Sequence, residues 1–400
     1  MSRPVVGPQS SVNERLVALE IVRQVLVLRF SLRVRQLIVD AINKTEVPVA
    51  RMIRDALHTD AGLRDPGQLR ELERLIDQLN AIRQPAWQAG RLAAEDELKA
   101  LADAEPEDQR DLFAFLLPGV ELLLPSVVGG LGAAALITPF QGRTFKRWLD
   151  DAEEAEQKRV RQAVVTGAAL GETPATVARR VVGTAPAQGR DGATQLSRNH
   201  IDTVVRSATI HFGAYARDQF YQANALTRYT PPPPGTPRPP VRPVGEPEDP
   251  MQAEAVRQAQ QARAAADRAA GGAGKGGSKL FLLEQYVAVL DNRTTKLCRG
   301  LDGNRYRLGE GPIPPLHMNC RSNRVVVLPD AVGGPLYDPG QYGAWVRSQP
   351  FEVQALLMGS TRARKLTDEE LADTAFEDYG ARPMTLGQIR DEARRIMEFY

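Results

Sequence analysis

Apolar residues recur at steps of three and four over much of the chain, which is the spacing of one face of an α-helix. The longest such stripe covers residues 12–43, and Ser11-Val-Asn-Glu14 at its start has the form of a capping box. The same spacing predicts further helices at 49–57, 68–83 and 87–101. Leu69 is expected to face inward in the second of these, and Pro85 is expected to interrupt the helical pattern between the second and the third. The N-terminal part should form a helical bundle or a long helical hairpin.

The range 119–139 is the most apolar part of the chain. It is long enough to suggest a membrane span. However, it contains Glu121, Pro125 and three glycines, which weaken a continuous helix. We therefore expect a helix and a loop buried in a packed interior, and no insertion into a membrane.

Helical signals continue after this segment. Thr173-Pro174 provides an N-cap and a proline at the first helical position, and Gly183 should end that helix. Ser197 is predicted to cap a helix that runs to about Asn224. Towards the C-terminus, helices are predicted to begin at 340–345, at Pro350 and after the cap Thr385.

Composition changes sharply between residues 230 and 280. The range 231–250 contains ten of the 29 prolines, an Ala/Gln/Arg-rich stretch follows, and five of the eight residues at 271–278 are glycine. Proline-rich chains are stiff and extended, whereas glycine-rich chains are flexible. This predicts an exposed insertion or linker that the fold does not need.

These patterns predict a mainly α protein with a small β-hairpin subdomain (α+β) that carries a Cys–His motif. Five consecutive ranges are expected: an N-terminal helical region, a central helical part, the insertion, the β-hairpin part and a C-terminal helical tail, at 1–117, 118–229, 230–280, 281–330 and 331–400.

Charge and cysteine content exclude some classes of protein. The 400 residues carry a formal net charge of only +2, so the chain as a whole is not drawn to nucleic acid. Arginines along the first predicted helix could contact DNA or an acidic partner, although a solvated helix surface is favoured; these are Arg15, Arg23, Arg29, Arg33 and Arg35. Two cysteines exclude a disulfide-rich secreted scaffold. The N-terminus has no apolar core of signal-peptide length, which predicts synthesis in the cytoplasm.

The strongest chemical signal lies between Tyr286 and Val327, where both cysteines and one of the four histidines fall within 23 residues. Alternation after Tyr286 predicts a strand, and Asp302-Gly303 predicts a tight turn into a second strand near Tyr306. A proline-rich loop follows, and a further strand is predicted at 321–328. This arrangement should bring together Cys298, His317 and Cys320.

Several chemistries fit these three residues. Thiols and imidazole are zinc ligands, and Asp291 or Asp302 could supply a fourth. Alternatively, the thiols pack as small hydrophobic groups, or they form a disulfide, which a reducing cytosol disfavours. A catalytic Cys–His pair is less expected because no orienting carboxylate is recognisable.

The motif also resembles a known family. The residues that carry the resemblance are Asp291-x-Arg293-Thr294-x-x-x-Cys298-x-x-Leu301-Asp302-Gly303 and then Pro314-Pro315-x-His317-x-x-Cys320-Arg321-Ser322. This pattern is similar to that of phage head morphogenesis proteins, the minor head proteins of the phage Mu F-like type. Several members carry a further cysteine where this chain has Thr295. Arg206-Ser207 and Ala216-Arg217 resemble the helix that precedes the motif, so the likeness covers about 140–224 and 282–328.

The resemblance implies a structural protein of a tailed phage, without catalytic residues, that lies in the capsid interior near the portal vertex and is made in the host cytoplasm. Implied partners are the portal protein and the major capsid or scaffolding protein, with packaged DNA as a further contact, and implied roles are procapsid assembly and DNA packaging or ejection. A structural role is implied for Asp291, Arg293, Thr294, Asp302, Gly303, Pro315 and Arg321. We expect the N-terminal helices to dock on the partner, and the chain after about Asp103 to fold without them.

Two other functions remain open from the sequence. One is a metal-dependent hydrolase or toxin-like transferase that uses Asp291, Arg293 and His317. The other is a DNA-binding or membrane-active ejection protein.

Overall fold

The computed structural model describes residues 11–57, 66–116, 122–184, 186–187, 189, 191–224, 283–288, 294–327, 346–347, 349–365 and 382–400. These residues are mostly helical, with one small antiparallel sheet, so the predicted fold class is confirmed. The predicted insertion at 230–280 lies outside the described residues. So do Asp291, Arg293 and the helix start predicted at 340–345.

Contacts divide the chain into two compact units. The first unit comprises Met1–Phe30, Ala100–Ala135 and Thr209–Tyr400, and the second comprises Ser31–Lys99 and Leu136–Ala208. Three long helices contribute residues to both units: α1 (Val12–Asn43), α3 (Pro66–Leu116) and α7 (Gln195–Asn224). The five consecutive ranges drawn from the sequence remain a prediction.

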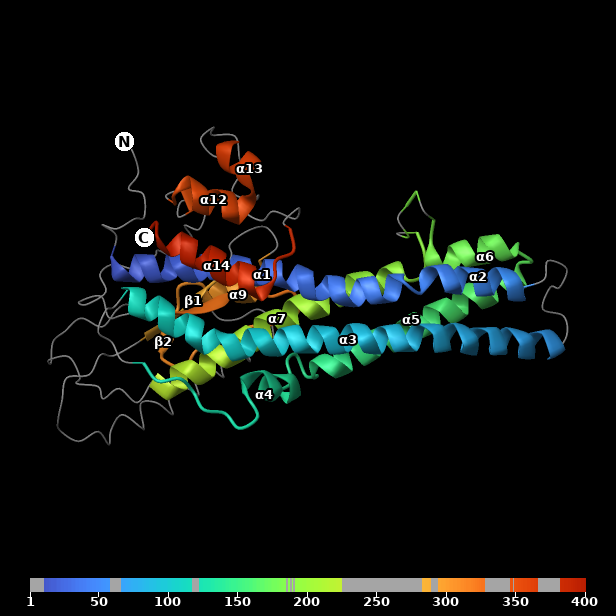
Figure 1. The fold of residues 1–400 in the computed structure, drawn as a ribbon, viewed down its shortest axis with the longest axis horizontal. Coiled ribbons are helices and arrows are strands. Elements are labelled where there is room, and N and C mark those ends of the chain that lie inside the picture. The colour runs from blue at the N-terminus through green and yellow to red at the C-terminus, as the bar shows by residue number, and fades with distance from the viewer. Residues whose placement is uncertain are drawn as a thin grey trace. The chain divides into compact units, whose positions relative to one another are not determined.

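The second unit has its own apolar core. Its shorter helices are α2 (Glu46–Ala56), α5 (Phe145–Ala169) and α6 (Pro174–Val182), and α6 lies against α2 and α5 (Figure 1). Buried side chains of these helices and of α3 form one cluster, including Ile53, Leu75, Leu79, Val164, Val177 and Val181. Amphipathic spacing in each helix therefore produces a shared interior.

Helix ends with a strong local signal lie where the sequence predicts them. Ser11 N donates to Glu14 Oε2 at 2.9 Å and Glu14 N donates to Ser11 Oγ at 3.1 Å, so the capping box before α1 is confirmed. Thr173 caps α6, which ends at Gly183. Thr385 caps α14 (Leu386–Met397) in a second capping box. The segment α12 (Phe351–Met358) begins after Pro350 as predicted, and α13 (Ser360–Lys365) follows it.

The predicted break at Pro85 is wrong, because α3 continues through it from Pro66 to Leu116. A proline inside a helix costs about 3 kcal/mol. Apolar residues are buried on both sides of Pro85, among them Leu79 and Trp87, and their burial offsets that cost. The inward assignment of Leu69 is also wrong: it is 51% exposed, and Leu75 is buried instead.

Two further boundaries differ from the prediction. The helix α2 begins at Glu46, ahead of 49, and α7 begins at Gln195, so Ser197 lies inside it and accepts from Arg159 at 2.6 Å. The helix α5 continues through Gly167. A Cβ atom there would lie 2.7 Å from Val177 Cγ2, so glycine serves close packing and not helix termination.

Within the apolar range 119–139, the described residues, which begin at 122, are mostly not buried as predicted. Residues 122–127 have no regular structure, Leu123 is 67% exposed and Val128 is fully exposed. Only the short helix α4 (Leu131–Ile137) buries part of the segment. The Asn224 side chain bonds both Leu123 N and Leu123 O, at 2.9 and 3.0 Å, and so satisfies a backbone that has no helical partners. Across the described ranges, no helix is long and apolar enough to cross a membrane.

The sheet belongs to the first unit. It consists of β1 (Leu283–Val287), β2 (Arg305–Arg307) and β3 (Asn323–Val327) in the order β2-β1-β3, with both pairings antiparallel. Glu284 of β1 lies opposite Tyr306 on one side and Val326 on the other. The two predicted return strands are therefore confirmed. A short helix that was not predicted, α9 (Lys296–Leu301), lies between β1 and β2 in sequence.

Gly90 of α3 packs against α1 within the second unit, and we expect Gly90→Ala to destabilise the protein. An added Cβ would lie 2.9 Å from Ile38 Cα, a backbone atom that cannot rotate away. The loss should be about 1–3 kcal/mol in urea unfolding. Gly213→Ala in α7 is the control: nothing lies within 4 Å of its Cβ position, so it should stabilise by about 0.5–1 kcal/mol. Equal stabilisation by both variants would contradict the close approach.

Candidate metal site

Cys298, His317 and Cys320 meet in the first unit, which confirms that they converge. Cys298 lies on α9, whereas His317 and Cys320 lie on the loop between β2 and β3. Cys298 Sγ is 3.0 Å from His317 Nε2 and 3.8 Å from Cys320 Sγ. All three donor atoms lie within 4.8 Å of one another, so the group could hold a metal ion.

Local backbone structure places each of the three side chains. Thr295 caps α9, because its Oγ1 accepts from Cys298 N at 3.3 Å. Cys320 N donates to His317 O at 3.2 Å and closes the loop through Asn319, which has a positive φ of 59°. Asparagine tolerates this left-handed conformation better than most residues. The His–x–x–Cys spacing thus forms a tight turn that aims both side chains at Cys298.

The His317 ring is held in an orientation suited to a ligand. Its Nδ1 lies 2.8 Å from Met318 O, and a carbonyl only accepts, so Nδ1 carries a proton. In the neutral ring, Nε2 then has its lone pair directed towards Cys298 Sγ. A backbone carbonyl that sets the tautomer in this way is the usual partner of a metal-binding histidine.

The thiols are buried in the small core of the sheet. Cys298 and Cys320 are both reduced and buried, and His317 is half-buried. The same core contains Tyr286, whose hydroxyl lies 3.3 Å from Cys298 Sγ. The position of Tyr286 beside the sulfur was not foreseen, since the sequence shows it only as the start of a strand.

The contacts within the cluster shift the pKa values of the two thiols in opposite directions. Hydrogen bonds from Cys320 and then His317 hold the pKa of Cys298 well below its usual range, against the opposing effect of burial. The hydrogen bond to Cys298, together with burial, raises the pKa of Cys320. Burial alone would lower the pKa of His317, but its hydrogen bond to Cys298 outweighs this and raises it. The cluster therefore favours loss of the proton from Cys298 over loss from Cys320.

Of the two predicted candidates for a fourth ligand, Asp302 does not join the group. Asp302 Oδ1 instead accepts from Ala288 N at 2.8 Å, and Asp291 lies outside the described residues. A hydroxyl oxygen does lie beside the inward-facing nitrogen of the histidine: Thr295 Oγ1 is 3.0 Å from His317 Nε2. This is the position at which several of the resembled family members carry cysteine.

The other described motif residues support the turn and the loop. Gly303 has a φ of +76°, and its N–H donates to Tyr286 O at 2.8 Å, which joins the turn to β1. Asp302, Pro315 and Arg321 are buried, and Thr294 is half-buried. The predicted turn at Asp302-Gly303 is confirmed and leads into β2, but α9 and not a strand precedes it.

Buried ion pairs beneath the sheet were missed by the sequence analysis. Arg324 of β3 pairs with Glu284 of β1 at 3.2 Å and with Asp218 of α7 at 2.6 Å. Gly309 and Gly311 also donate their backbone N–H groups to Glu284. Burial raises the pKa of Glu284, and the charge of Arg324 opposes this. The pairs tie the sheet to α7.

A second buried group centres on Glu105 of α3. It accepts from Arg217 at 2.8 Å and from Arg23 at 2.5 Å, and Arg217 also bonds Asn323 of β3. Arg23 is therefore not part of a solvated basic surface, contrary to the favoured interpretation. Arg15 and Arg29 likewise donate to backbone carbonyls, those of Tyr400 and Leu356.

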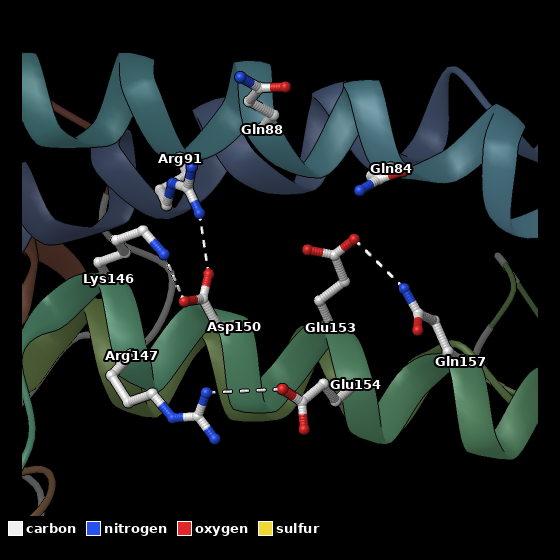
Figure 2. Close-up of a pocket in the computed structure, with 9 residues that line it drawn as sticks. All are labelled: Gln84, Gln88, Arg91, Lys146, Arg147, Asp150, Glu153, Glu154 and Gln157. Atoms are coloured by element: carbon white, nitrogen blue, oxygen red, sulfur yellow. Dashed lines mark hydrogen bonds and ion pairs between the residues drawn. The ribbon is translucent and has the colours of Figure 1, made fainter.

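A polar hollow of about 470 Å³ lies between α3 and α5 in the second unit (Figure 2). Arg91 and Lys146 both pair with Asp150, at 2.8 and 2.6 Å. Figure 2 also shows Arg147 directed at Glu154, and Glu153 bonded to Gln157. Because these charges are paired with one another across an open surface, the hollow does not define a ligand site.

No family model, no curated protein and no solved structure matches this chain. The likeness to Mu F-like minor head proteins therefore rests on the motif residues and their order. Function follows from those residues and from the geometry that they adopt.

Proposed function

We propose that the chain is a structural minor head protein of a tailed phage, acting in head morphogenesis. The observation that carries this is how the motif residues are used. Gly303 bonds the backbone of β1 and Asp302 bonds that of Ala288 just after it, and Cys298 and Cys320 are buried against Tyr286. These motif residues therefore stabilise the strands and the loop between them. That use fits a structural protein better than an enzyme, whose motif residues would line an open active site.

The partners follow from the same resemblance. The protein would contact the portal and the major capsid or scaffolding protein, inside the capsid near the portal vertex, after synthesis in the bacterial cytoplasm. It would aid procapsid assembly and DNA packaging or ejection. The internal pairing of Arg23 with Glu105, and of Arg15 with Tyr400 O, favours protein partners over DNA for the N-terminal helix.

The enzyme alternative receives less support. His317 Nδ1 faces Met318 O and its Nε2 faces Cys298, so both nitrogens already have partners within the chain. Cys298 and Cys320 are buried, which leaves their sulfurs without the exposure that a nucleophile for a macromolecular substrate needs. The other residues assigned to this alternative, Asp291 and Arg293, lie outside the described residues.

Zinc is the metal that this donor set fits best. Two thiolates bound tetrahedrally at 2.3 Å from zinc lie about 3.8 Å apart, and the sulfurs of Cys298 and Cys320 are 3.8 Å apart. A sulfur and an imidazole nitrogen would lie about 3.6 Å apart, compared with 3.0 Å here between Cys298 and His317. A small outward shift of the ring would admit the ion, which would link α9 to the loop before β3.

Locating the chain in particles tests the function. Procapsids and mature phage carrying a tagged chain would be purified, the chain quantified by mass spectrometry and its density sought at the portal vertex. A gene deletion should lower the yield of DNA-filled heads, and a plasmid copy should restore it. Particles that lack the chain yet assemble and infect normally would overturn the proposal.

We expect Thr295→Cys to raise zinc affinity by roughly 10- to 100-fold, because a third thiolate, as the fourth ligand, would replace a hydroxyl beside His317. Affinity would be measured by competition with a chromophoric chelator, and zinc content by elemental analysis. Thr295→Ser keeps the hydroxyl cap of α9 and serves as the control, with affinity unchanged. If the cysteine and serine variants bind zinc equally, Thr295 does not lie at the fourth position.

A further inference from the structure

The two cysteines are already in contact as a pair. They are the only cysteines in the chain, both are reduced, and their sulfurs lie 3.8 Å apart. One is on α9 and the other precedes β3, with the turn, β2 and the proline-rich loop between them. A disulfide bond is about 2.05 Å long. Forming it therefore requires the two sulfur atoms to approach each other by about 2 Å, a movement that both side chains can share.

We propose that Cys298 and Cys320 form a reversible dithiol–disulfide site, and that the disulfide and a bound metal are alternative ways of closing the same cluster. Metal binding needs thiolate donors, and a disulfide has none. The two closures therefore exclude each other. The chemistry itself does not depend on the proposed phage function.

The oxidant would be a small hydroperoxide. Cys298 loses its thiol proton and its sulfur attacks one peroxide oxygen; the O–O bond breaks, and the departing oxygen takes up a proton and leaves as an alcohol (water, for hydrogen peroxide), giving a sulfenic acid. The thiol of Cys320 then attacks that sulfur, the S–O bond breaks, and water leaves with the second proton. Two electrons pass from the sulfurs to the peroxide, and a thiol reductant reverses the reaction. Entry is expected beside His317 and Thr295, which are half-buried, whereas Cys320 is fully buried.

The proposed phage function, if it holds, supplies a setting for this change. Thiols stay reduced in the host cytoplasm and meet oxidising conditions after lysis. Oxidation would then tie α9 to the entry of β3 in the released particle. Cross-linking a loop of this length stabilises a fold chiefly by restricting the unfolded chain.

The test uses the full-length protein, purified with reductant and stripped of metal. After hydrogen peroxide treatment, the protein is denatured and alkylated with iodoacetamide, and mass spectrometry counts the labels. We expect two labels before oxidation and none after it, with both restored by dithiothreitol. The melting temperature should rise by roughly 4 °C on oxidation. Cys298→Ser and Cys320→Ser each leave one thiol and should show no such rise.

Three outcomes would overturn the proposal. The thiols could keep both labels, oxidise separately to sulfinic acid, or cross-link two chains, which a non-reducing gel would show. A further arm preloads the protein with zinc before peroxide is added. Oxidation should slow at least about tenfold, because bound thiolates are unavailable for attack. Unchanged oxidation of protein shown to contain zinc would overturn the statement that the two closures compete.

Discussion

Replacing Glu105 by glutamine is expected to lower the free energy of unfolding by about 3–5 kcal/mol, because the change removes the negative charge that Arg23 and Arg217, both buried, share. Glu105 is fully buried between Arg23 and Arg217, and each guanidinium donates two hydrogen bonds to it. Glutamine keeps the shape of the side chain but loses the negative charge and half of its acceptor capacity. Both arginines are themselves buried and have little access to water as a substitute.

Urea unfolding followed by circular dichroism would measure the loss. Glu107→Gln is the matched control two positions along the same helix, where the carboxylate is largely exposed and 3.5 Å from Arg390. Exposed pairs contribute little, so the control should unfold almost as the unmodified protein does. Equal midpoints for both variants would show that the buried group does not stabilise the first unit.

The same carboxylate predicts a dependence on pH. Burial alone would raise the pKa of Glu105, but the charges of Arg23 and then Arg217 outweigh it and lower the pKa from 4.5 to about 2. Because the unfolded chain binds the proton more readily, this stabilisation is fully present above pH 4.5 and is lost as the pH falls towards 2. Its size is about 3 kcal/mol. The acid sensitivity of stability between those values should therefore be weaker in Glu105→Gln.

Predictions from the sequence succeeded where the signal was local. The caps Ser11, Thr173 and Thr385 each sit within three residues of the backbone groups that they satisfy. The helix break predicted at Pro85 was wrong because the sequence shows the local cost of a proline. It does not show the burial against other helices that offsets this cost. The prediction that the segment around Leu123 is buried was wrong for a related reason. The hydrophobicity of a segment does not show whether another part of the fold covers it.

In the candidate site, too, features with a local sequence signal were predicted and the others were missed. The turn at Asp302-Gly303 and the proline-rich loop made the convergence of Cys298, His317 and Cys320 predictable. The helix α9 was missed because six residues are too few to show a helical period. The pairing of Arg23 with Glu105 spans 82 residues and carries no periodic signal. Such a pair becomes visible only when the packing of α1 against α3 in the first unit is known.

A chain that begins at residue 104 is expected not to fold cooperatively, which reverses the expectation drawn from the sequence. Residues of α1 up to Phe30 belong to the same compact unit as the sheet. Deletion would remove a stripe of fully buried apolar side chains, each contributing about 1.5–3 kcal/mol; they include Leu16, Val17, Val22, Leu26, Val27 and Phe30. It would also leave Asn323 of β3 without Glu20, and Ser322 O without the Gln24 amide.

Thermal unfolding and limited proteolysis would test this on two shortened chains. One begins at residue 104, and the other begins at Pro66, which keeps α3 whole and removes only α1 and α2. Both should lack a cooperative transition, since both lose Arg23 and the buried α1 stripe. Replacing 230–278 by a short Gly/Ser linker is the control for shortening, and it should leave the melting temperature nearly unchanged.

A sharp transition in the chain that begins at 104 would show that the sheet and α7 are stable without α1. Docking by the N-terminal helices could then be tested by deleting them. If that transition is absent, the docking surface has to be mapped by single exposed substitutions, because deletion would remove the fold together with the surface.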